Sequence, residues 1–149
     1  MIRAVICDDE TASLVIIRYL IESEGLPVEI AGTASNGQEA LELIQKEEPD
    51  LAFLDIQMPK LDGFHVLEKL GEVKTKVIFI TVYNTFAYAQ RAMQFRVMDY
   101  LLKPLSLTGV REALARIRAS LDEAFARRLD EAAFLEQQRQ DRVQIGRLR

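Results

Sequence analysis

The chain has 149 residues, 49% of them apolar, which suits one compact domain with some additional chain. Its net charge of −4 is uneven, since residues 1–106 hold 10 basic and 16 acidic side chains, whereas residues 107–149 hold 9 and 7. Duplex binding depends on neutralising phosphates with basic side chains, so the acidic part is not expected to bind nucleic acid.

Cysteine content and hydropathy indicate where the protein resides. The only cysteine, Cys7, lies in an apolar run, so we expect neither a disulfide framework nor a cysteine metal site. No apolar stretch approaches the roughly 18 to 20 residues that cross a bilayer, and the N-terminus lacks a signal-peptide pattern. We therefore predict a cytoplasmic protein without membrane association.

Strand and helix patterns alternate along the chain. Short apolar runs alternate with stretches of helical spacing and with turn signals. Strands are predicted at 2–7, 28–34, 51–55, 76–81 and 97–102, and helices at 11–24, 36–48, 63–70, 84–95 and from 107 onward. This alternation predicts an α/β fold, with a doubly wound five-stranded parallel sheet and helices on both faces.

Polar side chains stand where the predicted strands end. Asp55 closes an apolar run that is typical of a strand buried on both faces. If the five strands are parallel, the residues beyond their carboxyl ends share one edge of the sheet, where ligands bind in open α/β folds. These residues are Asp8, Asp9, Asp55, Thr81 and Lys103.

The residue types at this edge indicate phosphoryl chemistry. Clustered carboxylates repel one another unless a cation joins them, and an all-oxygen site suits Mg²⁺. The Asp55 carboxylate could act as a nucleophile toward phosphorus and form an acyl phosphate. Lys103 supplies an ammonium for the phosphoryl oxygens, and Thr81 supplies a hydroxyl donor.

Five separated motifs occur in order along the chain: Asp8-Asp9, Asp55 with Met58-Pro59 and Asp62-Gly63, Thr81, Tyr100, and Lys103-Pro104. Together they resemble the CheY-like receiver domain of two-component response regulators. The resemblance covers Met1 to about Ser120 and implies a flavodoxin-like sheet of order 2-1-3-4-5.

The resemblance implies a role for each acidic residue. A sensor histidine kinase would phosphorylate Asp55. Asp9, Asp55 and the backbone carbonyl of Gln57 would bind Mg²⁺, with Asp8 helping directly or through water. The protein would then be a phosphoacceptor that assists its own phosphotransfer and slow autodephosphorylation, and not a turnover enzyme.

The resemblance also implies a conformational switch. Lys103 would bind the phosphoryl group, Thr81 would follow it inward, and Tyr100 would turn toward the core. Val82 departs from the small residue usual in the family, and we expect it to restrict access to Asp55. Tyr83 is expected to tune the phosphoryl lifetime together with Gln57. A cis Lys103-Pro104 bond is also implied.

The C-terminal part carries a weaker helical pattern. One apolar stripe is expected to pack on the sheet, formed by Leu107, Val110, Leu114, Ile117 and Leu121. Helical signals continue through Phe125, Leu129 and Leu135 to Arg149. We divide the chain into a receiver domain at 1–120 and, at 121–149, a helical linker or dimerisation extension toward an absent output domain. A solvated linker and a dimerising coiled coil both remain open.

The predicted output is regulation of transcription, through a homodimer formed on phosphorylation. DNA would be bound only through an output domain outside this chain, because no helix-turn-helix pattern follows. Residues 83–90 and 99–104 look like receivers joined to AraC-type or LytTR-type DNA-binding domains.

Two alternatives to this output are a single-domain receiver and a pseudo-receiver that acts as an interaction module. A phosphatase of the haloacid dehalogenase type is disfavoured, since Cys7-Asp8-Asp9-Glu10 lacks its Asp-x-Asp spacing.

Overall fold

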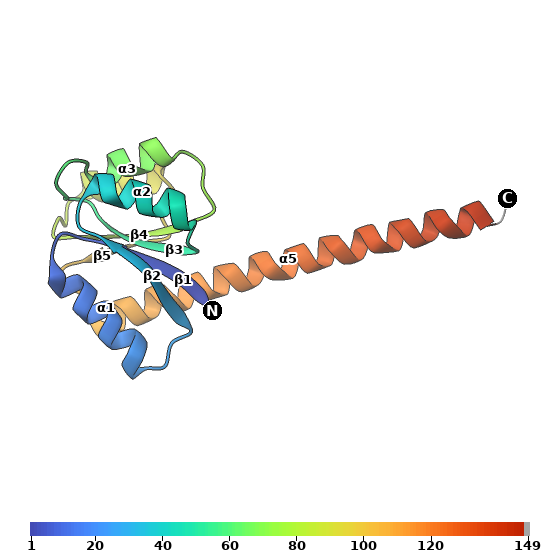
Figure 1. Ribbon diagram of the computed structural model, residues 1–149, viewed down its shortest axis with the longest axis horizontal. Helices are drawn as coiled ribbons and strands as arrows, with labels where there is room; N and C mark the ends of the chain where they lie inside the picture. The colour runs from blue at the N-terminus through green and yellow to red at the C-terminus, as the bar shows by residue number, and fades with distance from the viewer. Residues whose placement is uncertain (148–149) are drawn as a thin grey trace. The chain divides into compact units, whose positions relative to one another are not determined.

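The computed structural model describes residues 1–147, without the side chains of residues 124, 125 and 143–147. Its five strands form one parallel sheet of order β2-β1-β3-β4-β5, interleaved with helices as predicted (Figure 1). The strands are β1 (Ile2–Cys7), β2 (Val28–Ala34), β3 (Leu51–Asp55), β4 (Lys76–Thr81) and β5 (Asp99–Leu102). The helices are α1 (Thr11–Ser23), α2 (Gly37–Glu47), α3 (Gly63–Leu70), α4 (Phe86–Gln94) and α5 (Leu107–Arg147). The predicted doubly wound, flavodoxin-like fold with an extended C-terminal helix is therefore confirmed.

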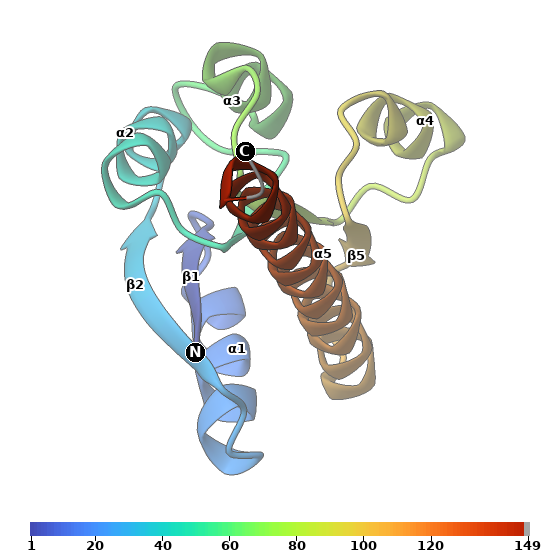
Figure 2. The ribbon, with the colours of Figure 1, turned by 90° about the vertical axis from the view of Figure 1, so that its right-hand side faces the viewer.

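The central strand β3 explains why the sheet carries helices on both faces. All five of its residues are buried, and it pairs with β1 on one side and β4 on the other. Helices α2, α3 and α4 cover one face, whereas α1 and the first turns of α5 cover the other (Figure 2). Because β1 and β3 are adjacent while their helices lie on opposite faces, the strand order reverses between them, where open sheets bind ligands.

Side-chain caps fix the starts of three helices. Asn36 accepts a hydrogen bond from the Glu39 amide at the start of α2, and Asp62 does the same for α3. Thr85 caps α4, so this helix begins at Phe86 and not at Asn84 as predicted. Strand β5 likewise begins two residues later than expected, at Asp99.

Helix α5 is continuous, but its residues belong to two compact units, Met1–Ala115 and Arg116–Arg149. In the first unit Val110 and Leu114 are buried as predicted, whereas Leu107 is 42% exposed. Leu107 is the first helical residue, and helical side chains lean toward the N-terminus, so it extends beyond the packed turns. The prediction that it packs on the sheet was wrong.

In the second unit Ile117 is buried, whereas the described side chains from residue 122 onward are exposed. Leu129, Phe134 and Leu135 are more than half exposed. The predictions that involve the Phe125 side chain and a helix reaching Arg149 lie outside the described residues. Across residues 1–147, none of the helices combines the length and apolar character that a membrane span requires.

Candidate functional site

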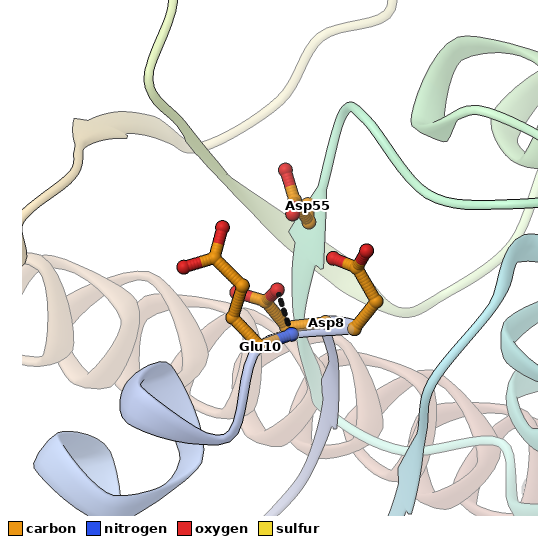
Figure 3. Close-up of side chains that lie close together, drawn as sticks. Asp8, Glu10 and Asp55 are labelled. Carbon is orange, nitrogen blue, oxygen red and sulfur yellow. Dashed lines mark hydrogen bonds between the residues drawn. The ribbon is translucent and has the colours of Figure 1, made fainter.

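Four carboxylates converge at the carboxyl-terminal edge of the sheet (Figure 3). Asp8, Asp9 and Glu10 follow β1, and Asp55 is the last residue of β3. Each residue offers one oxygen, and these oxygens lie within 4.8 Å of one another. The parallel register pairs the last residue of β1 with the penultimate residue of β3, so Asp8 and Asp55 reach the edge at the same level.

Lys103 places an ammonium group inside this acidic cluster. Its Nζ lies 2.9 Å from Asp8 Oδ2, 3.0 Å from Asp55 Oδ2 and 3.2 Å from Glu10 Oε1. The lysine follows β5, which is two strands away from β3, so only a long side chain can reach the carboxylates. Its backbone amide donates to the carbonyl of Thr81 at 2.7 Å, which fixes where the side chain starts.

Burial and the single ammonium group set the charge of the site. Burial raises the pKa of Asp55 to about 7; Asp8 adds to this rise and Lys103 opposes it. Burial also disfavours ionised Asp8, but hydrogen bonds from Ser13, the Glu10 amide and Lys103 hold the pKa of Asp8 below its usual value. Although burial disfavours the charged ammonium, the two aspartates raise the pKa of Lys103. One ammonium group thus faces four carboxylates, so acidic groups outnumber basic ones in the site.

The donor set fits a hard divalent cation. Asp8 Oδ2 is buried and makes no hydrogen bond within the described part of the chain, although Lys103 Nζ is in ion-pair contact with it. Asp9 and Glu10 are exposed, so their oxygens are accessible from solvent. Carboxylate oxygens with access to water are the ligands that Mg²⁺ prefers.

The loop after β3 lies against the same cluster. The amide of Gln57 donates to Asp55 Oδ1 at 3.1 Å, and the amide of Gly63 donates to the carbonyl of Ile56 at 2.7 Å. A Cβ on Gly63 would lie 2.8 Å from the Asp55 carbonyl oxygen, so this position leaves no room for a side chain. The loop is thereby held beside Asp55.

A sequence model described as the response regulator receiver domain matches residues 4–115. The chain belongs to the response regulator receiver family. The receiver is 34% identical to the transcriptional regulatory protein HptR of Staphylococcus aureus over 123 residues, which cover 83% of this chain and 49% of HptR. It is 31% identical over 134 residues to a response regulatory protein of Staphylococcus epidermidis, covering 90% of this chain and 53% of the relative. The chain thus spans about half the length of these relatives.

Solved structures agree with this assignment. The REC domain of AraT from Geobacillus stearothermophilus superposes with a TM-score of 0.71 at 34% identity, covering 83% of this chain and 97% of that one. The response regulator domain of Thermotoga maritima CheB gives a TM-score of 0.69 at 27% identity, covering 82% and 97%.

In this receiver, the β4–α4 loop connects Thr81 to Tyr100. Thr81 is fully buried, and its Oγ1 accepts a hydrogen bond from the Tyr83 amide at 3.1 Å. The Tyr100 hydroxyl donates to the Tyr83 carbonyl at 2.7 Å, and Tyr83 stacks on Tyr88 with ring centroids 4.9 Å apart. Burial, with a smaller effect of Tyr88, raises the pKa of Tyr100. The backbone of Tyr83 therefore links the two residues predicted to act as a switch.

Val82 lies on the side of the site that faces α1. It is 59% exposed and lines a cavity of about 250 Å³ together with Glu10, Ser13 and Lys103. This position is compatible with the predicted effect on access to Asp55, which stays a prediction. The Lys103-Pro104 peptide bond is cis, as the resemblance implied.

Glu10, Ser13 and Arg91 contribute to the site without having been predicted. Glu10 belongs to the acidic run after β1, which was the signal for a third carboxylate near Lys103. Ser13 stabilises ionised Asp8, and Arg91 lines a cavity beside Gln57. Nothing in their spacing distinguishes Ser13 and Arg91 from ordinary helix residues.

Proposed function

We propose that Asp55 accepts a phosphoryl group from a sensor histidine kinase in a Mg²⁺-dependent reaction. One observation carries the proposal: the Asp55 side chain is only 5% exposed, yet it ends in the cluster of four carboxylates with a lysine ammonium 3.0 Å away. A buried carboxylate beside an ammonium and a cation site is suited to carry a transferred phosphoryl group.

Each side chain has a defined part in the transfer. An oxygen of Asp55 attacks phosphorus, the bond from phosphorus to the kinase imidazole breaks, and the imidazole leaves with the bonding electron pair. Lys103 exchanges its contact with the Asp55 carboxylate for one with a phosphoryl oxygen, and Thr81 donates a hydrogen bond to another. Asp8, Asp9, Asp55 and the Gln57 carbonyl would hold Mg²⁺, which supplies neutralisation of the phosphoryl charge.

The product is a modified protein rather than a released compound. Water slowly hydrolyses the acyl phosphate, with Val82, Tyr83 and Gln57 controlling its access, so the receiver is not a turnover enzyme. Phosphorylation adds about −1.5 to −2 charge. When Thr81 moves toward the phosphoryl group, the hydrogen bond that it accepts from the Tyr83 amide is disturbed. Because the Tyr83 carbonyl accepts a hydrogen bond from Tyr100, this movement shifts the conformational equilibrium of Tyr100 and α4.

The output is proposed from relatives that are about twice as long as this chain. Residues 1–120 would form the receiver, and 121–149 would form a linker or dimerisation helix toward an output domain of AraC or LytTR type. Phosphorylation would favour a homodimer that regulates transcription in the cytoplasm, with DNA bound by the output domain. The relative HptR, which is named a transcriptional regulatory protein, supports the proposed role in transcription. A single-domain receiver and a pseudo-receiver are the alternatives.

The test is metal-dependent modification of the purified chain. Wild type and Asp55→Asn are incubated with acetyl phosphate, with Mg²⁺ or with a chelator, and followed by intact mass and by oligomeric state. We expect one added phosphoryl group on wild type with Mg²⁺ only, none on the variant, and a shift toward dimer. The absence of modification in both proteins would contradict the proposal and favour the pseudo-receiver.

A further inference from the structure

A second cavity opens beside the acidic cluster, on the side that faces α4. It holds about 410 Å³, and its lining includes Asp9, Gln57 and Met58 from the site and Phe64, Tyr88 and Arg91 from α3 and α4. Two of these residues, Asp9 and Gln57, are proposed metal ligands. A molecule in the cavity would therefore lie next to the phosphoryl position.

Arg91 is fixed in this cavity by an aromatic ring. Its Cζ lies 4.2 Å from the centroid of the Phe64 ring, a cation–π contact. Phe64 is 1% exposed and packs edge-on against Phe79, with centroids 5.2 Å apart, so the ring itself is held firmly. The guanidinium group consequently has a defined position at the cavity wall.

The Arg91 side chain forms a long ion pair with Glu68 and makes no hydrogen bond with the described part of the chain. Its Nη2 lies 3.9 Å from Glu68 Oε1, which is beyond hydrogen-bonding distance. The side chain remains 45% exposed. A guanidinium presents several N–H groups in a planar fork that matches a carboxylate or a phosphate. A fixed arginine with uncommitted donors in a catalytic cavity is suited to bind an anion.

We propose that this cavity binds the acyl half of small acyl phosphates, and that Arg91 binds the carboxylate that they release. The proposal rests on the proposed function of Asp55. An Asp55 oxygen attacks phosphorus, the bond from phosphorus to the acyl oxygen breaks, and that oxygen leaves with the electron pair as part of a carboxylate. No proton has to move, and Arg91 stabilises the negative charge that develops on the leaving group.

Arg91 adds a positive charge to the lining of this cavity, and Asp9 adds a negative one. Asp62 lines it too, but its Oδ1 already accepts hydrogen bonds from the His65 amide and lies 2.8 Å from His65 Nδ1. Asp9 would be neutralised by the cation that it holds. A phosphohistidine donor releases a neutral imidazole instead, so Arg91 is expected to act on small donors selectively.

Two donors with different leaving groups test the proposal. Acetyl phosphate releases acetate, whereas phosphoramidate releases neutral ammonia from its N-protonated form. Phosphorylation rates with both donors and Mg²⁺ are measured for wild type, Arg91→Gln and Arg91→Lys. Arg18→Gln, on the exposed surface of α1, is the matched control for loss of one positive charge.

We expect Arg91→Gln to lower the acetyl phosphate rate about tenfold and to leave the phosphoramidate rate within about twofold of wild type. Arg91→Lys should recover part of the loss, and Arg18→Gln should change neither rate. An unchanged ratio of the two rates in Arg91→Gln would overturn the proposal, including the case in which both rates fall together. If wild type accepts phosphoryl from neither donor, the function of Asp55 itself is wrong and the inference is wrong with it.

Discussion

Replacing Asp55 with asparagine is expected to stabilise the metal-free protein, and to do so more strongly as the pH rises. Burial and the Asp8 charge make ionisation of Asp55 unfavourable in the folded state, so its pKa rises from 3.8 to about 7. In the unfolded chain the same carboxyl ionises in water near its ordinary pKa. Wild type therefore loses stability between these two values, while the amide of the variant never ionises.

The change in the free energy of unfolding can be worked out from the pKa shift of Asp55. At about 1.4 kcal/mol per pKa unit, the cost of ionised Asp55 reaches up to about 4 kcal/mol above pH 7. At pH 5 the folded carboxyl is still mostly protonated, so the cost is only about 2 kcal/mol. Because the pKa of Asp55 is higher in the folded protein, the stability that its protonated form provides is fully present below about pH 4. That stability is lost as the pH rises through about 7.

Urea unfolding in the presence of a chelator, at pH 5 and pH 8, measures this difference. The free energy of unfolding of Asp55→Asn should exceed that of wild type at both values, with the larger excess at pH 8. Asp130→Asn, on the exposed surface of α5, is the matched control and should show no excess at either pH. A variant no more stable than wild type at pH 8 would refute the assignment of Asp55 as a buried and electrostatically strained carboxylate.

Three further substitutions test other parts of the structure. Gly37→Ala should destabilise the fold by about 1–3 kcal/mol and weaken Mg²⁺ binding in a fluorescence titration, because its Cβ would lie 1.9 Å from the Leu61 carbonyl oxygen in the β3–α3 loop. Tyr100→Phe should lower the free energy of unfolding by about 0.5–1.5 kcal/mol, because it removes the hydrogen bond to the Tyr83 carbonyl. Val82→Ala should leave unfolding unchanged, since Val82 is 59% exposed, and should speed phosphorylation by acetyl phosphate.

Each of these expectations has an outcome that contradicts it. Gly32→Ala is the control for Gly37→Ala, because the three atoms nearest to its Cβ would all belong to the side chain of Leu43. Equal Mg²⁺ affinity in both variants would contradict the prediction that Gly37 affects Mg²⁺ binding. A Tyr100→Phe protein as stable as wild type would show that the hydrogen bond to the Tyr83 carbonyl adds no net stability. Equal phosphorylation rates of wild type and Val82→Ala would contradict the role of Val82 in restricting access to Asp55.

The edge of the sheet could be predicted because its position depends on backbone direction alone. Once the strands are parallel, every carboxyl end lies on one side, and the polar residues Asp8, Asp55, Thr81 and Lys103 are brought there together. Strand pairing then sets their level along the edge. Periodicity in the sequence is sufficient for this argument, since no side-chain conformation enters it.

Contacts that depend on tertiary packing could not be predicted in the same way. The acceptor for the Tyr100 hydroxyl is a backbone carbonyl, at Tyr83, which every residue possesses and no pattern marks. Arg91 and Phe64 are far apart in the sequence and meet only because α4 packs beside α3. Leu107 fitted the apolar stripe of α5 yet is exposed, because spacing gives the face of a helix but not where the packed turns begin.

The location of the phosphoryl group is the measurement that decides between a phosphorylated receiver and a pseudo-receiver. Wild type treated with acetyl phosphate and Mg²⁺ is reduced with borohydride, which converts an acyl phosphate into a stable alcohol, and the peptides are sequenced by mass spectrometry. The modification is expected at Asp55 alone, and it should disappear when Mg²⁺ is chelated. Modification at Asp8 or Asp9 instead, or at no aspartate, would contradict the role assigned to Asp55.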